Sequence, residues 1–117
     1  MHEMGIIAGV LDAVNASAAD AGATSVLTVN LRVGVMTEAI EDALVFAFEA
    51  LSEGTLCEGA NLEIEWIGPK SVCFECGNEF SHDRFHRACP QCGGFETHIT
   101  AGRELEIASI EVDLPDD

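Results

Sequence analysis

Hydrophobic residues recur at helical spacing in two stretches of this chain, and the pattern predicts two amphipathic helices. The first spans residues 3–21, and Gly22 supplies a stop signal after it. Its apolar positions are Ile6, Ile7, Val10, Leu11 and Val14. The second helix is expected to have Thr37 as its N-cap and to end near Gly54. Its apolar positions are Ile40, Leu44, Ala47, Phe48 and Leu51.

Three further stretches alternate between apolar and polar residues, which predicts half-buried strands. In residues 25–35 the apolar positions are Leu27, Val29, Leu31 and Val33. The second strand ends before Pro69, and its apolar positions are Leu62, Ile64 and Trp66. The third spans residues 104–114. Because each element has one apolar face that needs a partner, we expect an α+β fold with two helices packed on a three-stranded sheet.

Between the last two predicted strands lies a segment with little regular periodicity. It spans residues 71–102 and contains four of the five cysteines and three of the four histidines. A chain of 117 residues can form one compact domain and a small appendage. We therefore expect one α+β domain formed by residues 1–70 plus 103–117, with residues 71–102 as a metal-binding insertion.

The four cysteines of the insertion form two matched pairs, each with two residues between its members and a glycine after the second. The first pair is Cys73 and Cys76, and the second is Cys89 and Cys92. Two intervening residues let both thiolates reach one ion from a tight turn. Four thiolates complete a tetrahedron and leave no position for a substrate, so the spacing predicts a structural zinc site.

Two other interpretations of the insertion remain open. Iron in a rubredoxin-like arrangement could occupy the same four thiolates. His82, His86 and His98 are expected to be solvated loop residues, although any of them could hold a second, transient metal ion. The fifth cysteine, Cys57, is expected to be a core or loop thiol with no assigned role.

The charge of the chain limits the kinds of partner that we expect it to bind. Twenty-one acidic residues stand against five Lys and Arg residues, which gives a net charge of -16. Such a surface repels nucleic acid, and no apolar run is long enough to span a membrane, so we expect neither partner. The absence of a signal-peptide pattern predicts a cytoplasmic protein. The acidic excess also suits a cytosol of high salt concentration and suggests a halophilic source.

The N-terminus combines several nitrogen donors. A bulky His2 is expected to leave Met1 in place with a free α-amine. The Met1 amine, the His2 amide and the His2 ring could then close fused chelate rings around one ion, with Glu3 as a further ligand. An in-plane set of nitrogen donors suits Ni(II) and Cu(II) and does not suit zinc. A histidine at position two is also common as a solvated terminal side chain.

Several segments together resemble the HypA/HybF family of hydrogenase nickel-incorporation proteins. They are the opening Met-His-Glu, residues 54–64 (GTLCEGANLEI), the cysteine pairs ending in CPQCG at residues 89–93, and residues 102–107 (GRELEI). The resemblance implies that His2 binds nickel, assisted by the Met1 amine and Glu3. It implies that Cys73, Cys76, Cys89 and Cys92 hold zinc.

The resemblance also implies partners. Family members work with a nickel-binding GTPase and hand nickel to the large subunit precursor of [NiFe] hydrogenase. The strongly acidic composition departs from the family's pattern and argues against partners that dock on a basic surface of this chain. A zinc-ribbon module that binds nucleic acid or protein would explain the cysteines alone. A thiol redox enzyme would need a reactive cysteine in an electropositive setting, and no catalytic motif is present, so we expect a protein that is not an enzyme.

Overall fold

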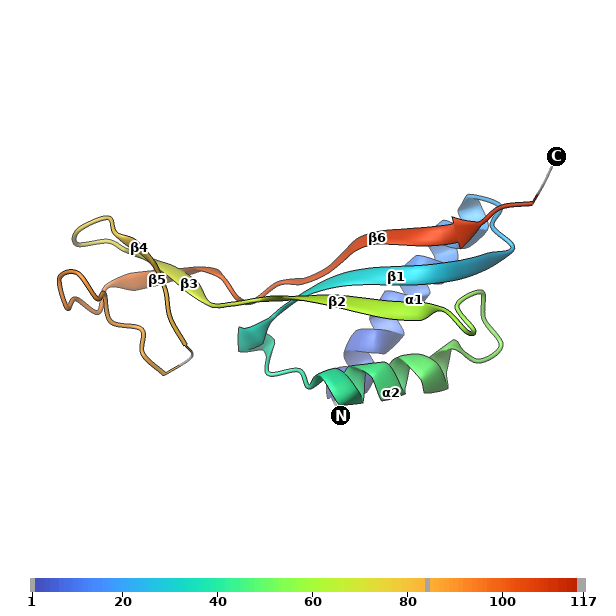
Figure 1. Cartoon of the computed structure of the whole chain (residues 1–117), viewed down its shortest axis with the longest axis horizontal. Helices are drawn as coiled ribbons and strands as arrows, with labels where there is room; N and C mark the ends of the chain where they lie inside the picture. Colours follow the sequence, from blue (N-terminus) through green and yellow to red (C-terminus); the bar gives the residue numbers. More distant parts are fainter. Residues whose placement is uncertain (1, 84, 116–117) are drawn as a thin grey trace. The chain divides into compact units, whose positions relative to one another are not determined.

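A computed structural model describes residues 2–83 and 85–115 of the chain (Figure 1). Its strands form two three-stranded sheets, with the orders β2-β1-β6 and β4-β3-β5. The elements in chain order are α1 (His2–Asp20), β1 (Ser25–Gly34), the 3-10 helix η1 (Val35–Thr37), α2 (Glu41–Ser52), β2 (Asn61–Ile67), β3 (Lys70–Cys73), β4 (Glu79–Ser81), β5 (Thr97–Ala101) and β6 (Leu105–Asp113). The expected α+β fold, with two helices and one sheet built from the three predicted strands, is confirmed.

The chain divides into two compact units. Residues 1–31, 39–64 and 107–117 form the first, which we call the helical unit, and residues 32–38 and 65–106 form the second, which we call the cysteine unit. Each is described here by itself. The expected domain at residues 1–70 plus 103–117, with residues 71–102 as its insertion, stays a prediction. Among the described residues, no helix is both long enough and hydrophobic enough to cross a membrane.

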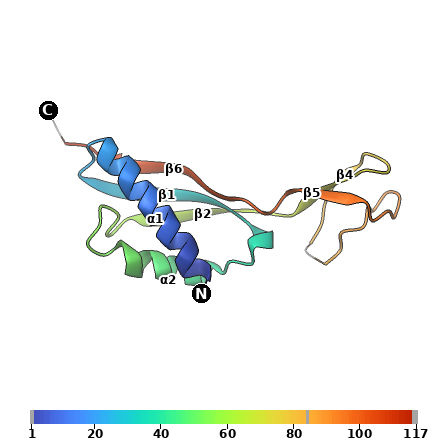
Figure 2. The same ribbon diagram turned by 180° about the vertical axis from the view of Figure 1, so that it is seen from behind.

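The core of the helical unit lies where α1 and α2 pack together and against β1. Figure 2 shows α1 running obliquely across the strands, with α2 beside it. The buried apolar residues from these three elements are Ile7, Val10, Leu11, Val14, Ala18, Val26, Val29, Leu31, Leu44, Ala47 and Phe48. The 3.6-residue spacing of α1 places its apolar side chains on one face, and burial of that face holds the helix in position.

The alternation predicted for β1 is wrong at Leu27, its first predicted buried position. Leu27 is 50% exposed, and Val26 is buried instead. From Val29 onward the buried positions alternate as predicted, through Leu31 and Val33. The spacing of three residues between Val26 and Val29 shifts the phase of the strand by one position, and a pattern that assumes strict alternation therefore assigns Leu27 to the wrong face.

The predicted cap of α2 is also wrong. Thr37 belongs to η1, where its hydroxyl donates to the Gly34 carbonyl at 2.8 Å. Glu38 then adopts a left-handed conformation (φ 63°), so α2 begins only after Ile40, whose side chain provides no cap. Ile40 and Leu51 are 63% and 38% exposed, so the buried face of the helix is narrower than predicted. The Glu3 side chain supplies the missing acceptor, because its Oε2 accepts the Ile40 N–H at 3.2 Å.

The sheet of the cysteine unit was not predicted. β3 pairs antiparallel with β4 and with β5, with Ser71 opposite Phe80 and Ile99. A close backbone approach adjoins this sheet: the Met36 N–H donates to the Gly102 carbonyl at 2.7 Å. A Cβ added to Gly34 would lie 2.0 Å from the Gly102 carbonyl oxygen, so only glycine fits there.

Candidate metal centre

Two turns of the same geometry present the cysteines. In the first, the Gly77 N–H donates to the Cys73 carbonyl at 2.8 Å, and in the second the Gly93 N–H donates to the Cys89 carbonyl at 2.8 Å. Both glycines have φ 76°, a left-handed conformation that a residue with a Cβ rarely adopts. The glycine after each pair therefore closes a tight turn, as the spacing predicts.

A second hydrogen bond repeats at the base of each turn. The Cys73 N–H donates to the Asn78 carbonyl at 2.9 Å, and the Cys89 N–H donates to the Gly94 carbonyl at 2.9 Å. The Asn78 amide also points its Nδ2 at the Cys89 sulfur, at 3.8 Å. The two turns are thus held by matching backbone hydrogen bonds, and Asn78 links the first turn to a sulfur of the second.

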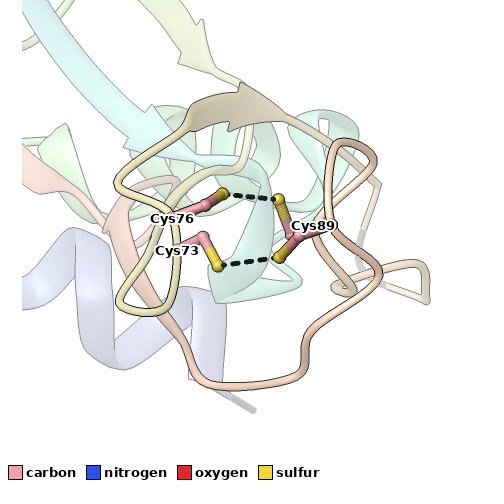
Figure 3. Close-up of side chains that lie close together, drawn as sticks. Cys73, Cys76 and Cys89 are labelled. Carbon is pink, nitrogen blue, oxygen red and sulfur yellow. Dashed lines mark hydrogen bonds between the residues drawn. The ribbon is translucent and has the colours of Figure 1, made fainter.

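The four cysteine sulfurs lie close together. All four are within 4.8 Å of one another, and Figure 3 shows Cys73, Cys76 and Cys89 pointing toward a common centre. The Cys73–Cys92 and Cys76–Cys89 sulfur pairs are each 3.6 Å apart. Zinc–sulfur bonds of about 2.3 Å in a tetrahedron place sulfurs about 3.8 Å apart, so this spacing fits a four-thiolate zinc site. The structure brings together the four cysteines that the sequence predicts as ligands.

The surroundings of the sulfurs shift the pKa values of the cysteine thiols in opposite directions. Burial raises the pKa of Cys89, but hydrogen bonds from the Cys92 and Gln91 amides outweigh this and lower the pKa to about 6. The Gly94 amide lowers the pKa of Cys92, but its contacts with Cys73 and the other thiols raise the pKa to about 12. Four adjacent sulfurs therefore resist losing all their protons together, and a divalent cation among them would supply the compensating charge.

The four cysteines of the cluster also differ in their exposure to solvent. Cys73 and Cys89 are buried, whereas Cys76 and Cys92 are exposed. A site with four thiolate donors has no open position, so its chemistry is to hold the two turns together and not to bind a substrate. The donor set is soft and closed, which suits zinc.

The three histidines of the cysteine unit lie apart from the four sulfurs. His82 is only partly exposed, and its Nε2 lies 2.7 Å from the hydroxyl of the buried Ser71, so the expectation of a solvated side chain is wrong for it. His86 is exposed and contacts Asp83, and His98 is exposed on β5, where its ring stacks on Phe74 at 5.9 Å. Among the described residues, the four cysteines are the only group of three or more side chains placed to hold one metal ion.

The predicted nickel site lies at the start of α1. His2 is the first residue of the helix, and its side chain is 51% exposed. Its Nε2 lies 3.3 Å from the Glu3 carboxylate, which also accepts the Ile40 N–H. Met1, the predicted source of the amine ligand, lies outside the described residues. The sequence did not reveal the contact between Glu3 and Ile40, because 37 positions separate the two residues.

Cys57 occupies a different environment. Its side chain is fully buried, and its sulfur lies 3.4 Å from the Asn15 side-chain oxygen of α1. Burial raises the pKa of its thiol. Cys57 therefore lies in a turn after α2 with its thiol in the core, which agrees with the expectation of a core or loop thiol, and it contributes to packing.

Comparison with known proteins identifies relatives over nearly the whole chain. The family described as hydrogenase/urease nickel incorporation, metallochaperone, HypA matches residues 1–112. The hydrogenase maturation factor HypA of Desulfitobacterium hafniense is 42% identical over 113 residues, which cover 97% of this chain and 99% of that protein. The corresponding factor of Rhizobium leguminosarum bv. viciae is 40% identical over 112 residues, which cover 96% of this chain and 99% of that protein.

Solved structures show the same fold. The solution structure of the Ni metallochaperone HypA from Helicobacter pylori matches with a TM-score of 0.70 and 23% identity, over 97% of this chain and 98% of that chain. A second solution structure, of a HypA protein, matches with a TM-score of 0.74 and 24% identity, over 96% of each chain. The family match over residues 1–112 and the relatives of 42% and 40% identity show that the chain belongs to the HypA family of hydrogenase nickel-incorporation metallochaperones, and is not an enzyme.

Proposed function

We propose that this chain binds Ni(II) at its N-terminus and delivers the ion to the large subunit precursor of [NiFe] hydrogenase. The observation that carries the proposal is the position of His2 at the start of α1, with a half-exposed ring, in a chain that belongs to a nickel-incorporation family. Nickel is cargo here: a site at a terminus can take up and release an ion without disturbing the core.

The proposed ligands are the Met1 amine, the His2 amide and the His2 imidazole, with Glu3 as a further ligand. Nitrogen donors in one plane favour Ni(II) over zinc. The Glu3 carboxylate adds a second role that the contacts support: it lies against the His2 ring and accepts the Ile40 N–H, so it can hold the ring near the start of α2. We therefore propose that Glu3 positions the His2 ring and that its carboxylate also serves as a nickel ligand.

The zinc ligands are proposed to be Cys73, Cys76, Cys89 and Cys92. The support is the 3.6 Å spacing of the sulfurs and the two matching glycine turns. Bound zinc would stabilise residues 71–102 as the predicted zinc-binding insertion, because metal binding supplies folding energy that a small core lacks. The zinc is structural, and the nickel is transported.

The other partners follow from membership of the family. We propose that a nickel-binding GTPase of hydrogenase maturation acts with this chain in the cytoplasm, and that neither nucleic acid nor a membrane is a partner. The surplus of 21 acidic residues over five basic ones supports the exclusion of nucleic acid, since phosphate binding depends on Lys and Arg.

Nickel titration of His2→Ala tests the proposed site. We expect the parent chain to bind one exchangeable nickel ion and the variant to lose that binding, while zinc content and the helical circular dichroism signal stay unchanged. His98→Ala is the matched control, because His98 is also exposed and lies in the cysteine unit. If His2→Ala binds nickel as tightly as the parent, the N-terminal site is wrong.

A further inference from the structure

Strand β6 lies at the edge of its sheet, and one side of its backbone has no partner strand. In the order β2-β1-β6, its only neighbour among the described strands is β1. No residue of β6 is fully buried. Residues 107–113 of this strand belong to the helical unit, and we call them the β6 edge. Such an edge presents a row of unpaired N–H and C=O groups with which another extended chain can pair.

A groove runs beside the β6 edge. It has a volume of about 300 Å³ and lies between α1 and β6, and Figure 2 shows the C-terminal half of α1 beside that strand. The lining residues are Ala13, Val14, Ser17, Ile107, Ser109 and Ile110. Ile107 is 38% exposed, and Ile110 is only partly covered. Apolar side chains of an added strand that point to the helix face of the sheet would enter this groove and cover both isoleucines.

The solvent face of the β6 edge is acidic. Glu111 and Asp113 alternate with Ile110 and Val112, and successive residues of a strand point to opposite faces. Both acidic residues are exposed, and neither carboxylate has a hydrogen bond or ion pair with any described residue. The sequence of the helical unit contains no Lys or Arg that could pair with them. Lys or Arg side chains of an added strand would lie opposite these carboxylates, where opposite charges stabilise a cross-strand pair.

The same carboxylates disfavour a second copy of this chain as the occupant. Two β6 edges paired with each other would bring Glu111 and Asp113 of both copies onto one short ladder. Like charges opposite each other in a sheet are destabilising, and natural edge strands use charged side chains to prevent such pairing. The charge distribution therefore favours a cationic partner over self-association.

We infer that the β6 edge binds an extended segment of a protein partner in which apolar residues alternate with Lys or Arg. The segment adds to the sheet as a further strand through backbone hydrogen bonds with residues 107–113. Its apolar side chains enter the groove beside α1, and its cationic side chains lie opposite Glu111 and Asp113. None of the residues 107–113 is a proposed nickel or zinc ligand, so this binding goes beyond the proposed function and can be altered separately from it.

Two synthetic peptides of equal composition test the inference on the full chain. In the first, Val and Lys alternate over about seven residues, which is the length of an ordinary strand. The second contains the same residues with all lysines at one end, so it has the same charge and no alternation. We expect the alternating peptide to bind about tenfold more tightly, because only its apolar side chains all reach the groove. Amide hydrogen exchange of residues 107–113 should slow when it binds.

Substitutions on either face of the β6 edge refine the test. We expect Ala13→Gln to weaken binding of the alternating peptide about fivefold or more, because the longer side chain fills the groove. Ala16→Gln is the matched control: it makes the same change at an exposed position of α1 that does not line the groove, and it should bind like the parent.

The charged face is tested in the same way. We expect Glu111→Lys to weaken binding about threefold at about 0.1 M salt and less at about 1 M, because the exposed cross-strand pair is screened. Glu49→Lys on α2 makes the same change in net charge and should have a smaller effect. Circular dichroism confirms that each variant is folded at both salt concentrations.

Four results would overturn the inference. Equal binding of the two peptides would show attraction by overall charge alone, and no binding of either would exclude the site. Unchanged exchange of residues 107–113 in the bound chain would place the peptide elsewhere. Parent-like binding by Ala13→Gln would show that the groove stays empty. If exchange of residues 107–113 slows when the concentration of the chain alone is raised, a second copy occupies the edge instead.

Discussion

Glu3 joins two parts of the helical unit that are far apart in sequence. Its carboxylate accepts the Ile40 N–H at the start of α2 and lies 3.3 Å from the His2 ring. Hydrogen bonds from its own backbone amide and from Ile40 lower the pKa of Glu3, although desolvation opposes them. A residue that sequence alone identifies as a possible ligand is therefore also a helix cap for a distant helix.

We predict that Glu3→Gln lowers the Tm at neutral pH. A carboxylate with a lowered folded pKa stabilises the folded state above its unfolded pKa, and this contribution is lost as the pH falls through the folded pKa. The difference in Tm between parent and variant should therefore shrink toward about pH 3. Thermal unfolding followed by circular dichroism measures it, with Glu49→Gln of α2 as the control. A difference that stays constant with pH would show that the charge of Glu3 is not involved.

Among the elements, the two cysteine turns show what spacing can and cannot predict. The pattern of two residues between cysteines with a following glycine predicts each turn, because the chemistry of the turn is local. The strands that support them, β3, β4 and β5, have three to five residues each. Such short strands leave too few alternating positions to detect, and their pairing depends on contacts between residues far apart in sequence.

Loss of one thiolate should disrupt the cysteine turns as a pair. We predict that Cys76→Ala lowers the zinc content from about one ion per chain to nearly none and makes residues 71–102 sensitive to protease. The helical circular dichroism signal should remain, because α1 and α2 belong to the helical unit. Gln91→Ala is the control, since it changes an exposed side chain of the second turn and keeps all four sulfurs. Unchanged zinc content in Cys76→Ala would contradict the assigned ligands.

For the molecule as a whole, charge dominates the expected response to solvent. The helical unit contains thirteen acidic residues and no Lys or Arg, so no lysine or arginine of that unit can pair with its carboxylates. The Debye length falls from about 30 Å at 0.01 M salt to about 3 Å at 1 M, which removes most of the mutual repulsion. The same composition gave rise to the prediction of a halophilic source.

We predict that the free energy of unfolding rises from low salt to molar salt. Denaturant titrations in KCl at both concentrations measure the change, and potassium sulfate at equal ionic strength separates screening from the general salting-out of apolar surface. A stability that is equal at low and high KCl would contradict the halophilic interpretation and leave the metal sites unaffected.

Both helices and the three strands of the first sheet were predictable because apolar residues recur along each of them at regular spacing, although β6 leaves Leu105 and Ile107 exposed. Periodicity predicted both helices and the strands of the first sheet, and cysteine spacing predicted the four sulfurs that the structure brings together. It failed at Leu27, where the phase of β1 shifts, and at Thr37, where a left-handed residue delays the helix. It could not reveal Ser71 beside His82, because that contact depends on the pairing of β3 with β4. Local rules succeed wherever the cause is local.

The close approach of Gly34, Pro69 and Gly102 has a consequence for how such a chain can change over time. A Cβ on Gly102 would lie 2.8 Å from the Pro69 Cα, so the backbone begins and finishes residues 70–101 at nearly the same point. A segment whose two ends lie close together is the kind of insertion that a folded domain tolerates, because a short turn can close the gap in its place. Residues 70–101 therefore meet the geometric condition for such an insertion, with Gly34 and Gly102 at its junction.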